Sequence, residues 1–194
     1  MFEHLEDYRI ILGSKSPRRQ MLLRGLDIDF EVVVRETDEN YPDSLTGKEI
    51  AEYLAKKKSE AFAPDCENAK TLVITADTIV CLNGETINKP VDREDAIRML
   101  KKLSGNCHEV FTGVCIRTKT MVKSFVSESK VYFTNLTEQE ICYYVDKYKP
   151  YDKAGSYGIQ EWIGYVGIQY IEGSYFNVMG LPTRAVYKAL KEVV

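Results

Sequence analysis

The chain has 194 residues, 44% of them hydrophobic, and its 26 basic and 29 acidic residues leave a formal net charge of −3. This length suits the core of one domain, so we expect a single domain over residues 1–194. The near balance of charge argues against a nucleic-acid-binding protein, and no apolar run approaches the length of a transmembrane helix. The five cysteines are scattered without a C-x-x-C motif, which is typical of reduced thiols in a cytoplasmic protein.

A short strand followed at once by a helix is predicted near the N-terminus. The apolar residues 10–12 indicate a buried strand, and Gly13 permits a sharp exit from it. Ser16 has the side chain of an N-cap, Pro17 suits the first helical position, and Gly25 is expected to end the helix. The free N–H groups of this turn, next to two arginines, can bind an anion. A surface helix start with solvated arginines explains the same residues equally well.

The next segments predict a strand, a polar loop and a helix. Residues 29–34 are apolar and rich in β-branched side chains, which indicates a strand. The acidic run 35–40 after them can provide a ligand for magnesium or form an ordinary solvated loop. A capping box at residues 46–49 opens a helix that extends to about Phe62. Lys58 lies on the apolar face of this helix, where a snorkelling side chain is favoured over an anion contact.

Residues 71–76 form the strongest candidate for a buried strand, and the apolar run 79–82 continues it. Asp77 interrupts this run, and a buried carboxylate is costly unless its charge is used. Asp77 is therefore the main catalytic candidate. The Asn-Gly pair at residues 83–84 predicts a hairpin turn, with residues 85–87 returning as a short strand.

The middle of the chain predicts one helix and a long antiparallel pair of strands. Lys89 precedes a proline and is held extended, which suits a fixed contact or an ordinary loop. A helix is expected over about 92–103, and strands over 109–117 and 122–133. His108 is then expected to be a polar residue at a strand end.

The last part of the chain is predicted to contain two helices, one strand and two irregular segments. A capping box at residues 137–140 opens the first helix. The loop at residues 151–160 contains two glycines, a charge pair and a terminal amide, and can line a site or simply form turns. Residues 162–171 alternate like a strand, and residues 173–180 are expected to be irregular. Pro182 begins the last helix.

The candidate site residues combine cations, carboxylates and a helix N-terminus. Distributed cations suit a triphosphate, and a carboxylate among them can hold Mg²⁺ or orient water. The chain contains neither a P-loop nor a G-x-G-x-x-G motif, and no nucleophile is paired with a base. These residues predict metal-assisted attack of water on a phosphate ester or phosphoanhydride. They are Ser14, Arg18, Arg19, Glu39, Lys58, Asp77 and Lys89.

Several blocks of sequence, in their order along the chain, resemble the Maf family of nucleoside triphosphate pyrophosphatases. These blocks are residues 14–19, 76–80, 88–90, 103–112, 152–160 and 177–182. No single block is specific to this family, but the occurrence of all six blocks over nearly the whole chain is specific to it. The resemblance implies an elongated α/β fold with a long mixed sheet, flanking helices and a central cleft between two lobes, similar to inosine-triphosphate pyrophosphatases. It also implies a homodimer.

The resemblance implies cleavage between the α- and β-phosphates of a nucleoside triphosphate, with Mg²⁺ or Mn²⁺ as cofactor. Asp77 would activate the attacking water, as general base or as metal ligand, and Glu39 would help to hold the metal. The positions matching phosphate contacts are Ser14, Arg19, Lys58 and Lys89. The positions matching the subgroup that prefers dTTP and UTP are Arg18, Thr78 and Gln160. Lys15 stands where glycine is frequent and can alter phosphate affinity.

Two other classes of function compete with an enzyme. A nucleotide-binding regulator of cell division would bind triphosphates without releasing pyrophosphate. A structural protein would show no change in thermal stability when nucleotides are added.

Overall fold

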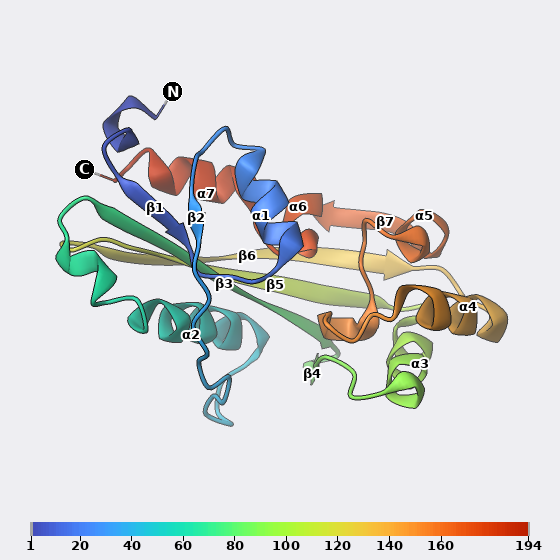
Figure 1. The fold of residues 1–194 in the computed structure, drawn as a ribbon. Helices are drawn as coiled ribbons and strands as arrows, with labels where there is room; N and C mark the ends of the chain where they lie inside the picture. The colour runs from blue at the N-terminus through green and yellow to red at the C-terminus, as the bar shows by residue number, and fades with distance from the viewer. Residues whose placement is uncertain (1, 194) are drawn as a thin grey trace.

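A mixed seven-stranded sheet runs along an elongated molecule and carries helices on both faces (Figure 1). This computed structural model describes residues 2–193. The strands are β1 (Arg9–Leu12), β2 (Glu31–Val32), β3 (Thr71–Leu82), β4 (Glu85–Ile87), β5 (Cys107–Arg117), β6 (Val122–Phe133) and β7 (Ile168–Gly173). Their order is β2-β1-β3-β5-β6-β7, with β4 also paired to β3. Strand β1 is parallel to β2 and β3, and the other pairs are antiparallel.

Helix α2 covers one face of the sheet, and α1, α6 and α7 cover the other, while α3 and α4 pack against each other at one end of the molecule (Figure 1). The α-helices are α1 (Pro17–Arg24), α2 (Gly47–Glu60), α3 (Arg93–Leu103), α4 (Glu138–Tyr148), α5 (Trp162–Gly167), α6 (Tyr175–Met179) and α7 (Thr183–Leu190). Short 3₁₀ turns are η1 (Glu3–Leu5), η2 (Asp65–Glu67) and η3 (Ala154–Ser156). Within residues 2–193, no helix combines the length and apolar character needed to cross a membrane.

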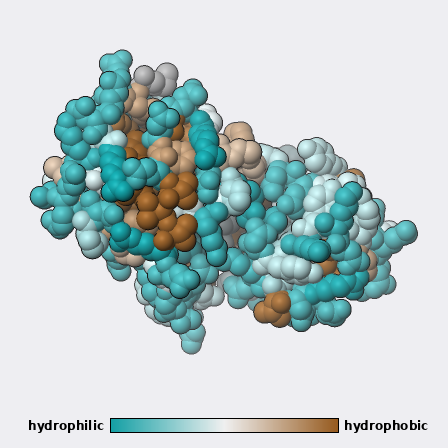
Figure 2. Space-filling model, in the orientation of Figure 1, coloured by the Kyte–Doolittle hydropathy of each residue, from teal (hydrophilic) through white to brown (hydrophobic). Residues whose placement is uncertain are grey.

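The alternation of β3 divides the core into two parts, because neighbouring residues of a strand point to opposite faces. On one face, Ile79 packs in a cluster with Leu54 of α2. On the other face, Ile74 and Leu23 of α1 belong to the larger cluster. Hydrophilic side chains dominate the surface, and a hydrophobic area gathers near β1 and β2 (Figure 2). Burial on both faces explains why β3 is almost continuously apolar in sequence.

The edge of β3 between β1 and β4 forms an opening in the sheet. Strand β1 ends where Leu12 pairs with Ile74, and β4 begins to pair at Val80. The residues of β3 between these pairings face β5 on their other edge. Gly13 ends β1 tightly, because an added Cβ would lie only 2.8 Å from Phe62 and from Thr75. The chain therefore leaves the sheet at once and enters α1 above the opening.

The prediction of one strand over residues 162–171 is wrong for its first half. Helix α5 occupies residues 162–167, and β7 begins only at Ile168. Gly164 allows this helix to pack against the loop before it, since an added Cβ would lie 1.8 Å from the carbonyl oxygen of Ile159. That contact between backbones is invisible in the alternation of side chains.

Two smaller predictions are also corrected. Only Glu31 and Val32 of the predicted strand 29–34 pair with β1, so most of that segment is not part of a strand. Residues 173–180, predicted to be irregular, contain α6. Ser174 caps this helix through the N–H of Asn177, and local capping rather than apolar periodicity defines it.

His108 lies at the start of β5, which agrees with its prediction as a strand-end residue, but its side chain is buried. It lies within β5 and is 1% exposed, with its ring stacked on Phe133 at a centroid distance of 5.5 Å. Its Nε2 lies 2.7 Å from the hydroxyl of Tyr157. Burial lowers the pKa of His108 to about 4 from an ordinary value of 6.5. The imidazole is therefore neutral over the physiological range.

This buried imidazole should make the protein less stable in mild acid. The pKa of His108 is lower in the folded protein than in the unfolded chain. The contribution of His108 to the free energy of unfolding is therefore complete above pH ~6.5 and is lost as the pH falls toward ~4. Between about pH 7 and pH 5, His108 should account for a loss of about 2 kcal/mol in the free energy of unfolding. Urea unfolding at both pH values should show this loss in the wild type and not in His108→Gln. His4→Gln, at an exposed histidine, is the control. An equal loss in His108→Gln and wild type would contradict the prediction.

Candidate active site

A cleft of about 1150 Å³ opens along the free edge of β3. Its walls come from the β1–α1 turn, the segment after β2, helix α2, the segment after β4, the loop before α5 and the end of α6. All the site residues predicted from the sequence line this one cleft, although they come from distant parts of the chain. They are Ser14, Arg18, Arg19, Glu39, Lys58, Asp77, Thr78, Lys89 and Gln160.

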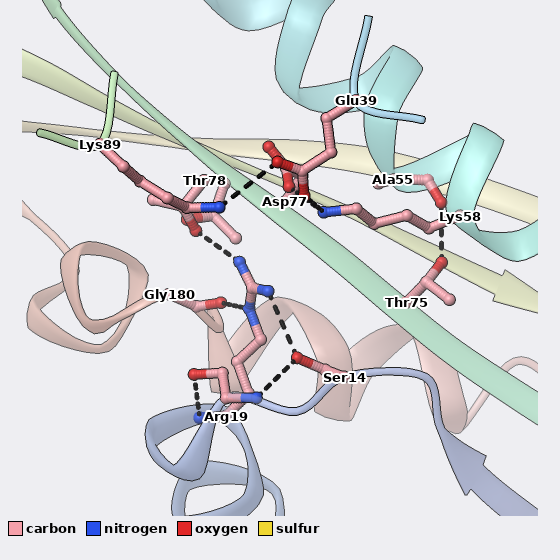
Figure 3. A network of polar contacts seen from close by, with 12 residues as sticks. Ser14, Arg19, Glu39, Ala55, Lys58, Thr75, Asp77, Thr78, Lys89 and Gly180 are labelled. Atoms are coloured by element: carbon pink, nitrogen blue, oxygen red, sulfur yellow. Dashed lines mark hydrogen bonds and ion pairs between the residues drawn. The ribbon is translucent and has the colours of Figure 1, made fainter. Parts of the chain in front are cut away.

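The turn between β1 and α1 forms as predicted and holds Arg19 in the cleft (Figure 3). The Ser16 hydroxyl caps the helix by accepting from the N–H of Arg19. The Arg19 guanidinium donates to the carbonyl oxygen of Gly180 at 2.8 Å, to Thr78 Oγ1 at 3.0 Å and to Ser14 Oγ at 3.4 Å. These contacts fix the fork of donors in advance of any ligand.

Thr78 contributes to this arrangement through its hydroxyl group. Its Oγ1 accepts from Arg19 and lies 3.0 Å from Thr112 Oγ1, which in turn donates to the carbonyl oxygen of Asn177. The chain of contacts joins β3, β5 and α6 behind the guanidinium. In this structure Thr78 therefore orients Arg19, and its predicted part in base selection stays a prediction.

Lys58 lies between the carboxylates of Asp77 and Glu39 (Figure 3). Its Nζ is 2.8 Å from Glu39 Oε1 and donates to Asp77 Oδ1. Lys89 Nζ approaches the other oxygen of Glu39 at 3.4 Å. The side chains of Lys58 and Asp77 are only 17% and 12% exposed, so Lys58 does not snorkel to solvent as its helix alone favours. Its charge keeps two carboxylates close together that would otherwise repel each other.

Asp77 and Thr78 are adjacent in β3 but serve opposite faces of the sheet. Asp77 meets Lys58 of α2, while Thr78 meets Arg19 of α1. Both can reach the same cleft because the edge of β3 is open at this point. The free edge thus brings the acidic pair and the arginine into one site from the two sides of the sheet.

The environment shifts the pKa of two groups in the cleft. Burial lowers the pKa of Arg19, against the opposing effect of the charge on Asp77. Partial burial of Glu39 acts to raise its pKa, but the hydrogen bond and charge of Lys58, together with Lys89, outweigh it and hold the pKa below its ordinary value. Glu39 is therefore an ionised carboxylate at neutral pH.

The donor set of the cleft fits a hard divalent cation that shares its ligands with a phosphate. Among residues 2–193, no group of three or more His, Cys, Asp or Glu side chains could hold a metal alone. Glu39 and Asp77 nevertheless provide two carboxylates that both pair with the one ammonium group of Lys58. Mg²⁺ is commonly held by one or two carboxylates together with substrate phosphates and water.

The sequence predicts only that the loop at residues 151–160 can line a site, and it assigns no role to Asp152 and Lys153, which lie at the other wall of the cleft. Lys153 Nζ lies 2.7 Å from Asp152 Oδ1 and 3.1 Å from Glu161 Oε1. Asp152 also accepts a 2.9 Å hydrogen bond from Arg18, and Glu161 accepts one from Gln160 Nε2 at 3.5 Å. The adjacent acidic and basic residues in a glycine-containing loop were the only signal for this cluster.

Comparison with known proteins agrees with this fold and site. The family described as Maf-like protein matches residues 9–193. A dTTP/UTP pyrophosphatase of Parabacteroides distasonis is 54% identical over 192 residues, covering 98% of this chain and 99% of that protein. One of Bacteroides thetaiotaomicron is 50% identical over 194 residues and covers both chains completely. The Ham1 protein of Staphylococcus aureus is 18% identical with a TM-score of 0.54, covering 93% of this chain and 99% of that one, which confirms the predicted fold class. The chain belongs to the family of Maf-like proteins.

Proposed function

We propose that this protein hydrolyses dTTP and UTP to the nucleoside monophosphate and pyrophosphate. The observation that carries the proposal is the meeting of Asp77 with Glu39, Lys58 and Arg19 in one cleft beside a helix N-terminus. Distributed cations around a helix N-terminus match the charge of a triphosphate. The two relatives named dTTP/UTP pyrophosphatase, each about half identical over the whole chain, support the choice of substrates.

In the proposed reaction, Asp77 accepts a proton from a water molecule that attacks the α-phosphorus. A new P–O bond forms to the water oxygen, and the bond from the α-phosphorus to the bridging oxygen breaks. The bonding electrons leave with pyrophosphate. Arg19 and Lys89 bind phosphate oxygens and stabilise the charge that develops on them.

Glu39 and Asp77 are the residues that would hold Mg²⁺ or Mn²⁺ in this site. When bound, such an ion supplies charge neutralisation on the phosphates and lowers the pKa of a coordinated water. Lys58 balances the charge of the two carboxylates, and with a divalent cation bound between them it would be placed to bind a phosphate oxygen. Arg18 and Gln160 are proposed to contact the base.

The experiment that tests this function measures the products formed from dTTP, UTP, CTP, GTP and ATP. With Mg²⁺ or Mn²⁺, we expect pyrophosphate as the primary product and the fastest turnover with dTTP and UTP. EDTA should abolish turnover, and excess Mg²⁺ should restore it. Orthophosphate as the primary product would contradict α–β cleavage. Binding of dTTP without product release would instead favour the nucleotide-binding regulator of cell division.

We further propose that the protein is a cytoplasmic homodimer. The cytoplasmic location is inferred from the scattered cysteines without a C-x-x-C motif, and the homodimer from the family resemblance. Sedimentation velocity at micromolar concentration tests the assembly. A single species with the mass of one chain would contradict it.

A further inference from the structure

Two acidic side chains hold the two residues proposed to select the base. Asp152 Oδ2 accepts a 2.9 Å hydrogen bond from Arg18 Nη1, across the mouth of the cleft from α1. Glu161 Oε1 accepts from Gln160 Nε2 at 3.5 Å. A carboxylate only accepts hydrogen bonds, so Glu161 requires the amide nitrogen of Gln160 to turn toward it. Each acidic residue therefore orients one selecting side chain.

Lys153 connects these two acidic residues. Its Nζ lies 2.7 Å from Asp152 Oδ1 and 3.1 Å from Glu161 Oε1. The side chain is only 9% exposed, and a lysine is rarely so buried unless its charge is paired. One ammonium group thus sets the position of both carboxylates and, through them, of Arg18 and Gln160.

The body of the protein anchors this cluster at one end. Tyr144, fully buried in α4, donates its hydroxyl to the second oxygen of Glu161 and accepts from the N–H of Gly158. Both oxygens of Glu161 are therefore bound, Oε2 by the Tyr144 hydroxyl and Oε1 by the Lys153 ammonium group. Because Glu161 is held in place, it fixes the position of the Lys153 ammonium group. Lys153 in turn fixes Asp152, which holds Arg18.

We propose that Lys153 is a positioning residue for base selection, acting on Arg18 through Asp152 and on Gln160 through Glu161. This inference rests on the proposed function and deepens it. Without the ammonium group, the carboxylates of Asp152 and Glu161 lose their common partner, and Arg18 and Gln160 are no longer held in a fixed geometry. Catalysis at Asp77 uses separate contacts and is affected less.

The test compares kcat and KM for dTTP, UTP and CTP in wild type and Lys153→Met. The ratio of kcat/KM for dTTP to that for CTP should fall by about tenfold, mainly through a higher KM for dTTP, because misplaced contacts lose binding far from the reacting atoms. Lys101→Met is the matched control. Lys101 joins two helices through Glu138 outside the cleft, and its removal should leave the ratio unchanged.

A second background separates positioning from a general structural role. In Arg18→Ala/Gln160→Ala, the substitution Lys153→Met should change the ratio by less than about twofold, because the residues through which it acts are gone. An unchanged ratio in Lys153→Met alone, or an equally large effect in both backgrounds, would overturn the proposal. If Lys153→Met does not fold, Asp152→Asn provides the test, since this side chain is largely exposed.

Asp152→Asn should lower the same ratio through Arg18 alone. Asp146→Asn is its control, because Asp146 forms a similar ion pair with Arg93 outside the cleft. An unchanged ratio in Asp152→Asn would overturn the proposal. A wild type that releases no pyrophosphate from any nucleotide would overturn the proposed function itself, whereas pyrophosphate release with an unaffected ratio in the variants overturns only the role of Lys153.

Discussion

Asp77→Asn is expected to lower kcat for pyrophosphate release by about 10²- to 10⁴-fold, the range that a general base contributes. The amide cannot accept a proton from the attacking water and is a weaker ligand for a divalent cation. Its carbonyl oxygen can still accept the hydrogen bond from Lys58, which Asp77 Oδ1 accepts in the wild type. The fold and the binding of nucleotide should therefore largely survive.

The measurement combines steady-state kinetics with the dTTP-induced shift of the melting temperature, which reports binding without turnover. Asp38→Asn is a closely matched control, because Asp38 pairs with Lys57, the neighbour of Lys58 on α2, and does not line the cleft. It should keep the wild-type kcat. Near-normal hydrolysis by Asp77→Asn would remove Asp77 from the mechanism.

Arg19→Ala is expected to lower kcat/KM for dTTP by about 10²- to 10³-fold, because the variant loses a fixed hydrogen-bond donor to the charged transition state. The guanidinium is already held by Ser14, Thr78 and Gly180, so little ordering is needed when a phosphate binds. Arg19→Lys keeps the charge but not the planar fork of donors and should recover only part of the loss.

Steady-state kinetics with dTTP and UTP check this expectation. Arg24→Ala is the control, since Arg24 lies in the same helix but packs over the ring of Phe30 instead of lining the cleft. Comparable melting temperatures for the two variants would separate loss of a phosphate contact from loss of stability. An Arg19→Ala enzyme with wild-type kcat/KM would contradict the assignment of Arg19 to the phosphates.

The sequence by itself determined the elements whose signals are local. The turn into α1 follows from Ser16 and Pro17, because a cap and a first helical position depend only on residues within one turn. Asp77 stood out because a carboxylate in an apolar strand needs a partner, and the structure supplies one in Lys58. The long pair of β5 and β6 was equally readable from composition and a polar turn.

Only the tertiary structure decided which of these residues meet. Asp77 and Thr78 are neighbours in sequence, but the alternation of β3 sends Asp77 toward α2 and Thr78 toward α1. The network of Lys153 and the helical start of α5 were missed for the same reason. The network depends on the ion pair between Lys153 and Glu161, and the start of α5 depends on the close approach of Gly164 to the backbone of Ile159. Such contacts form only when the chain packs, so the periodicity of the side chains does not reveal them.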